Sequence, residues 1–152
     1  MQKLEALIGQ LENKIPKMES LNQQISKGSV GWHIEHTLLV IDTIIESLQT
    51  SNPGEYQWKF NFVRTLVLTI RKIPRGRVQS PKSVQPNTHF NCETLQNHVV
   101  STQEKIKALD TLQRNHFFKH PFFGKLNLKP SIKFLILHTK HHINIINDIL
   151  DK

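Results

Sequence analysis

The sequence has little cysteine and no long apolar run, and both absences narrow the class of protein. Cys92 is the one cysteine among 152 residues, which excludes a disulfide scaffold. No stretch approaches the roughly 18 consecutive apolar residues of a membrane-spanning helix, and the first residues lack the apolar core of a secretory signal. We therefore expect a cytoplasmic protein with no membrane partner, in which Cys92 is a small buried residue.

Several sequence signatures are missing as well. The chain contains no GxGxxG, no P-loop, no CxxC and no internal repeat, and no alternating pattern typical of a β-strand. Apolar residues instead recur at the steps of three and four that indicate helices. With 38% hydrophobic residues, the composition is that of a globular protein, and the length fits one domain over residues 1–152. The predicted class is all-α.

Acidic residues are absent from two stretches, residues 56–92 and 111–147, although the formal net charge of the chain is +8. The first stretch holds seven cations and the second holds six. Such stretches occur in proteins that bind nucleic acid or anionic ligands, but they also form solvated surfaces that keep a protein soluble. We find no regular interleaving of aromatic residues of the kind that single-strand binders expose, so nucleic-acid binding is the minor alternative.

The helical pattern predicts four long helices and one short one. The predicted segments are residues 4–25 with a break at Pro16, residues 30–49 capped by Ser29, an apolar helix over residues 57–72, residues 93–112, and a last helix from Pro130 onward. Residues 73–89 form a long loop, and residues 115–129 form an aromatic-rich connection. This order predicts a four-helix bundle with an additional short helix between the second and third principal helices.

Polar residues of the second helix fall into two groups on a helical wheel. Glu35, Asp42 and Glu46 cluster opposite the apolar stripe, on a face that we expect to be the outer one. His33 and His36 lie near the stripe, and the wheel does not choose between them as candidate ligands.

The last helix carries a histidine pair in the middle of its apolar stripe. His138 and His142 are four residues apart, which brings their Cβ atoms to about 6 Å on one face. A buried imidazole needs a partner for each ring nitrogen, and imidazole is a common metal ligand. The pair therefore favours a metal site, and the alternative is a pair of core histidines bonded to hydroxyls or buried water.

Two motifs together resemble a known family. The run from Ser29 to His36, SVGWHIEH, combined with His138-x-x-x-His142, resembles the DinB/YfiT superfamily and, within it, the DinB-like branch known as DUF1569. The phrases GWHIEHTLLVI, IPRGRVQSPKSVQP, HPFFGKL and LHTKHHINIINDIL carry the resemblance over most of the chain. It implies a DinB-like four-helix bundle that holds a divalent ion on His36, His138 and His142 with one open coordination position, and homodimer formation, as in many members.

The resemblance also implies a reaction class. Members with known activity include thiol S-transferases and related metal-dependent enzymes, although Ile143-Asn144-Ile145 departs from the Arg-x-Gln that many relatives have after the second histidine of the pair. Three neutral histidines and an open position are the arrangement of a catalytic site. Among the metals that suit imidazole, zinc and nickel are the first candidates.

The expected function is therefore that of a metal-dependent transferase or hydrolase acting on a small molecule, such as an anionic thiol. We expect Trp32 to form a pocket wall, and Arg75 and Arg77 to grip the anionic substrate. The alternatives are a non-catalytic metal-binding bundle and, less favoured, a basic nucleic-acid-binding protein whose histidines belong to the core.

Overall fold

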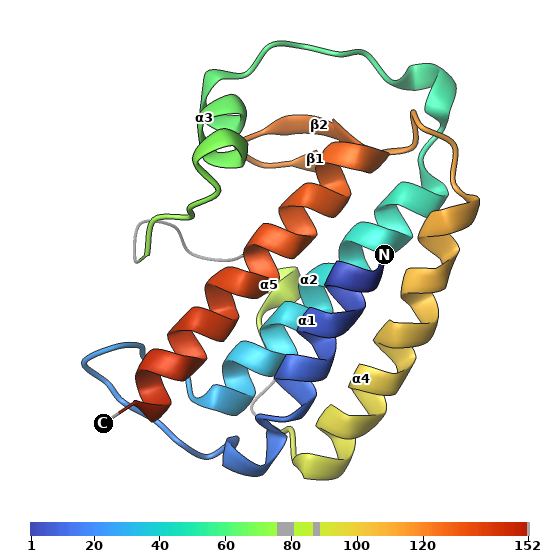
Figure 1. The fold of residues 1–152 in the computed structure, drawn as a ribbon. Helices are drawn as coiled ribbons and strands as arrows, with labels where there is room; N and C mark the ends of the chain where they lie inside the picture. The colour runs from blue at the N-terminus through green and yellow to red at the C-terminus, as the bar shows by residue number, and fades with distance from the viewer. Residues whose placement is uncertain (76–80, 87–88, 152) are drawn as a thin grey trace.

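The computed structural model describes residues 1–75, 81–86 and 89–151, and it is mostly helical with a small two-stranded sheet (Figure 1). The helices are α1 (Gln2–Glu12), α2 (Val30–Thr50), α3 (Phe62–Ile70), α4 (Cys92–Ile106) and α5 (Leu128–Leu150). The strands are β1 (Phe117–His120) and β2 (Gly124–Asn127). Short 3-10 turns span Ile15–Lys17, Pro53–Glu55, Lys82–Val84 and Lys107–Thr111.

Four long helices surround the core. α2 contacts α4 and α5, and α1 contacts the same two helices from the other side. The largest fully buried side chains are aliphatic and come mainly from these helices: Leu4, Ile8, Leu11, Ile34, Leu38, Ile41, Ile45, Leu48, Leu95, Ile106, Leu109 and Leu126. The mostly helical class agrees with the sequence prediction. Within the described part of the chain, no helix is long and apolar enough to cross a membrane.

The predicted connection over residues 115–129 contains the β1–β2 hairpin, so the expectation of no strand was wrong here. The strands pair antiparallel with Phe118 opposite Leu126, and both of these side chains are buried. Gly124 has a φ of +69°, a conformation that favours glycine. Four-residue strands are too short for an alternating pattern to stand out.

Local caps explain where α2 and α3 begin and end. Ser29 accepts a hydrogen bond from the backbone N–H of Trp32 at 3.2 Å, as predicted for the start of α2. α3 is shorter than predicted, because the Asn61 side chain caps it through the N–H of Arg64 at 2.8 Å. At its other end Arg71 adopts a left-handed conformation with a φ of 56°, which stops the helix.

The expected interruption of the first helix is present, because α1 ends at Glu12 and Pro16 lies in a separate 3-10 turn, but no α-helix follows it up to residue 25. The expectation for Cys92 was wrong. Cys92 is exposed rather than buried, because it is the first residue of α4, where its thiol contacts the Met18 sulfur at 3.4 Å.

Glu35 and Asp42 of α2 face α4, which corrects the expectation of an outer face for these two residues, whereas Glu46 is exposed as expected. The buried Asp42 accepts hydrogen bonds from Thr102, at 2.8 Å, and from Lys105. The His98 ring lies 2.9 Å from Glu35 through Nδ1 and 3.4 Å from Asp42 through Nε2. Burial alone would lower the pKa of His98, but its bonds to Asp42 and Glu35 outweigh burial and raise that pKa to about 9.

This network predicts a pH dependence of stability. The folded pKa of His98 lies above the unfolded value, so its contribution is fully present below pH 6.5 and is lost as the pH rises through about 9. We expect His98→Gln to lower the unfolding free energy by about 2–3 kcal/mol near pH 6 and by much less near pH 10. Denaturant unfolding at several pH values measures this difference. A constant difference, or the same profile in the exposed control His89→Gln, would contradict the prediction.

Candidate metal centre

Three histidines from two helices meet between α2 and α5. His36 comes from α2, and His138 and His142 come from successive turns of α5. One ring nitrogen of each lies within 4.8 Å of the other two, and this group could hold a metal ion. His36 and His142 are buried, whereas His138 is partly buried. The two motifs that were separate in the sequence therefore meet at one place.

The spacing of the rings fits ligands that share one ion. Nε2 of His138 lies 3.2 Å from Nε2 of His142, and the His36 ring centre is 4.7 Å from that of His142. Two nitrogens bound tetrahedrally to one zinc ion are about 3.3 Å apart. A single hydrogen bond has a similar length, but it would pair two of the three rings and leave the third unexplained.

A backbone carbonyl orients His36. Its Nδ1 lies 2.7 Å from the carbonyl oxygen of Val84, in the 3-10 turn Lys82–Val84. Because a carbonyl only accepts, Nδ1 carries the hydrogen and Nε2 keeps its lone pair for a ligand. Burial lowers the pKa of His36, and the bond to Val84 offsets only part of that effect.

A chain of hydrogen bonds stands behind His142. Its Nδ1 is 2.9 Å from Nδ1 of His33, and Nε2 of His33 is 2.9 Å from Oγ of Ser26. When Nε2 of His142 binds a ligand, its Nδ1–H donates to His33, which in turn donates to Ser26. Burial is the main cause that lowers the pKa of His33 to about 4, so this ring is neutral and can accept. His33 therefore supports a candidate ligand instead of belonging to the ligand group.

The remaining pKa shifts keep the cluster neutral. Burial, reinforced by the neighbouring rings, holds the pKa values of His138 and His142 well below the usual histidine value. Nδ1 of His138 is enclosed and has no hydrogen-bond partner among the described residues. A neutral imidazole offers a lone pair, so the chemistry of the donor set fits a cation bound by nitrogen.

Trp32 packs against this cluster, and its expected part in a substrate pocket stays a prediction. Its ring stacks on His36 with centres 5.0 Å apart and planes at 15°, and it meets His33 edge-on at 5.1 Å. Gly28 makes this position possible, because a Cβ there would lie 2.8 Å from the Trp32 ring.

Of the two arginines predicted to bind substrate, the structure describes Arg75. Arg75 is exposed and forms an ion pair with Asp148 of α5 at 2.6 Å. After burial, its charge is one of the causes that lower the pKa of His141 and of His33, so it acts electrostatically on the edge of the cluster. Arg77 lies outside the described residues. His141 is half-buried, meets His142 edge-on and does not belong to the ligand group.

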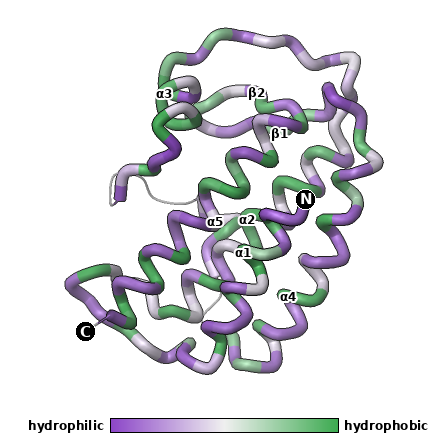
Figure 2. Tube along the Cα trace, in the orientation of Figure 1, coloured by the Kyte–Doolittle hydropathy of each residue, from purple (hydrophilic) through white to green (hydrophobic). Residues whose placement is uncertain are grey.

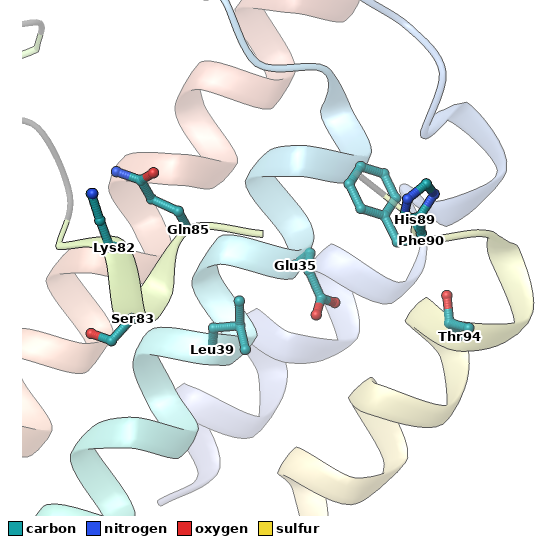
Figure 3. A pocket seen from close by; sticks show the side chains of 8 residues that line it. All are labelled: Glu35, Leu39, Lys82, Ser83, Gln85, His89, Phe90 and Thr94. Carbon is teal, nitrogen blue, oxygen red and sulfur yellow. The ribbon is translucent and has the colours of Figure 1, made fainter. Parts of the chain in front are cut away.

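The structure contains a hollow that is lined by other residues than the candidate ligands (Figure 3). Glu35 and Leu39 of α2 line it together with the segment around Lys82 and the segment around Phe90, and none of the three candidate ligands does.

Sequence reasoning missed the Val84 carbonyl that orients His36, because a backbone acceptor leaves no signal in the sequence.

The chain was also compared with known proteins. No family model, curated protein or solved structure matches it. Its function therefore has to be inferred from the site itself.

The packing of Trp32 against Gly28 can be tested directly. We expect Gly28→Ala to displace the indole from His36, to destabilise the protein by about 1–3 kcal/mol, and to shift the Trp32 emission. Gly9→Ala is the matched control, because a Cβ at Gly9 meets nothing within 4 Å and stabilises a helix by up to about 1 kcal/mol. Emission in the Trp58→Phe background isolates Trp32. Unchanged emission and stability in Gly28→Ala would contradict the contact.

Proposed function

We propose that this protein binds one divalent metal ion through His36, His138 and His142 and uses it in a transferase or hydrolase reaction. The observation that carries the proposal is the convergence of three ring nitrogens within 4.8 Å of one another. Their burial supports it, because a buried imidazole without a partner for each nitrogen is unfavourable.

The number of ligands supports a reactive site. Structural zinc sites usually have four protein ligands, whereas catalytic sites have three and leave one position open. The candidate group in the described part of the chain has three members, all histidines. A bound ion would lower the pKa of a water molecule to about 7 or hold a thiolate at neutral pH. Hydrolysis and thiol S-transfer are the reactions that such a position serves.

The surrounding residues have distinct roles in this proposal. Val84 and His33 hold the rings of His36 and His142 in the tautomers that leave a lone pair inside the cluster. Trp32 covers the His36 ring and limits its contact with water. An anionic substrate, such as a small thiol carrying a carboxylate, would compete with Asp148 for Arg75 at the edge of the cluster.

We further propose a DinB-like four-helix bundle with zinc or nickel as the ion. The mutual contacts of α1, α2, α4 and α5 support the bundle, and the positions of His36, His138 and His142 match those that the resemblance implies. A ligand set of three imidazoles suits zinc and nickel, whereas oxygen ligands would favour magnesium or calcium.

A second candidate function is metal binding without catalysis. The hollow in Figure 3 favours this function, because none of the three histidines lines it and a molecule held there would not touch them. The two functions differ in whether a small ligand reaches the ion. In the cobalt-loaded protein, a small thiol changes the visible absorption spectrum when it occupies an open position and leaves it unchanged when the ion is closed off.

Metal content is the first test. We expect protein purified without a histidine tag to carry about one divalent ion per chain. Single alanine variants of His36, His138 and His142 should lose most of it, because two ligands bind far more weakly than three. His141→Ala is the control and should retain the ion. Elemental analysis measures the content and circular dichroism checks the fold. Full retention in the His138→Ala, His142→Ala double variant would refute the site.

The support given by His33 has a smaller expected effect. His33→Gln replaces the rigid ring nitrogen that accepts from His142 with a flexible amide but leaves all three candidate ligands, so we expect metal affinity to fall about 10–100-fold. His141→Gln should leave affinity within about twofold. Competition with a chelator measures both variants. Equal affinities of His33→Gln and the unmodified protein would show that His33 has no part in holding the ligand.

A further inference from the structure

Apolar side chains are exposed along α3 and the segment that leads into it. Trp58, Phe60 and Phe62 are each 67% exposed, and they are followed by the exposed Val63, Leu66 and Ile70. We call these residues, together with the exposed Phe122 between the two strands of the hairpin, the α3 face. Figure 2 shows hydrophobic colouring along α3, beside the hairpin. Monomeric proteins rarely expose apolar patches larger than a few hundred Å².

α3 buries one charged residue and exposes several of its apolar residues. Its buried residue is Arg64, whose guanidinium donates to the carbonyl oxygens of Phe123, at 3.4 Å, and Lys125, at 3.3 Å. The Asn61 side chain caps α3 and also donates to the carbonyl of Phe122 at 3.0 Å. Polar groups thus fasten one side of α3 to the hairpin, and Val67 and Leu68 pack against the core, while Phe62, Val63, Leu66 and Ile70 remain outward.

Positive charge surrounds the α3 face. Lys59, Arg71 and Lys72 are exposed at its ends, and the face belongs to the two stretches of the chain that contain no acid. In the adjoining hairpin, Lys119 and Lys125 stand directly opposite each other. The Lys125 ammonium group donates to the backbone carbonyl of Glu55 at 2.8 Å and lies over the Phe117 ring. The exposed aromatic residues also correct the expectation that this basic stretch lacks them.

The chemistry of the face discriminates between three possible occupants. A second copy docked through the same face would bring cations near cations, with no acid from either stretch to pair them. Single-stranded nucleic acid would stack on the aromatic rings, but Val63, Leu66 and Ile70 offer no stacking surface. An anionic lipid surface matches both parts, because its headgroups pair with Lys and Arg while its acyl region takes up aromatic and aliphatic side chains.

We propose that the α3 face docks the protein on the surface of an anionic lipid bilayer, with Trp58, Phe60, Phe62, Leu66 and Ile70 entering the boundary between headgroups and acyl chains. The expectation of no membrane partner came from the lack of a spanning helix, which does not bear on binding at the surface. The docking residues are separate from the three candidate metal ligands, so the two proposals can fail independently.

Vesicle binding of the full-length chain tests this proposal. We expect sedimentation with vesicles of phosphatidylglycerol and phosphatidylcholine, little sedimentation with phosphatidylcholine alone, and weaker binding at high salt. In the Trp32→Phe variant Trp58 is the sole tryptophan, and its emission should shift to shorter wavelength on binding. Absence of binding to the anionic vesicles would overturn the proposal.

Exposed-residue variants separate the two parts of the interaction. Leu66→Ser with Ile70→Ser should reduce vesicle affinity at least tenfold, because both side chains lose their apolar contact with lipid. Lys59→Gln with Lys72→Gln should reduce it about thirtyfold, at about 1 kcal/mol for each charge near the surface. Lys17→Gln with Lys27→Gln is the matched control with the same change in net charge. These two residues belong to the segment between α1 and α2, at the opposite end of the molecule from α3 (Figure 1), and the pair should bind like the unmodified protein.

Two further outcomes would overturn the proposal in favour of another occupant. Light scattering that shows a dimer without lipid, dissociated by Ile70→Ser, would assign the face to a second copy. Binding of a single-stranded oligonucleotide that is lost in Trp58→Ala with Phe60→Ala but kept in Leu66→Ser with Ile70→Ser would assign it to nucleic acid. Circular dichroism checks that each variant is folded.

Discussion

Imidazole nitrogens buried between α2 and α5 need partners away from water, and this requirement organises the centre of the protein. His36 takes the carbonyl of Val84, and His142 takes His33, which in turn takes Ser26. Two segments outside the helices are thereby drawn against the core. Nε2 of His138 lies 3.2 Å from Nε2 of His142, where the cation that we propose would bind one nitrogen of each ring, and Nδ1 of His138 has no partner among the described residues.

α2 is the helix on which both polar layers depend. One of its sides presents His33 and His36 to α5, and another presents Glu35 and Asp42 to α4. The two layers have opposite electrostatics, since burial keeps the first neutral whereas carboxylates keep His98 protonated in the second. A helix in contact with two neighbours has little surface left for solvent, which is why its polar residues are paired with specific partners and not simply hydrated.

The parts of the fold that could be predicted from the sequence are the local ones. The Ser29 cap and the bounds of α2 depend on residues within a few positions, and the His138–His142 spacing depends only on helical geometry. The role of His33 could not be predicted, because it requires a contact 109 residues away with His142. The Asp42 side was mistaken for an outer face because a helical wheel shows which residues share a side but not which neighbour covers it.

α3 shows the same limit of helical periodicity in its clearest form. Its apolar residues recur at the spacing that usually indicates a side facing the core, yet Phe62, Leu66 and Ile70 are exposed and Arg64 is buried. The sequence alone cannot distinguish the two orientations, because the hydrogen bonds that hold Arg64 inward end on backbone carbonyls of the hairpin. Burying a guanidinium while exposing large apolar side chains is unfavourable for an isolated chain in water. The carbonyl oxygens of Lys59, Phe123 and Lys125 satisfy the guanidinium of Arg64, so the remaining cost lies in the exposed apolar side chains, and the docking that we propose would remove it.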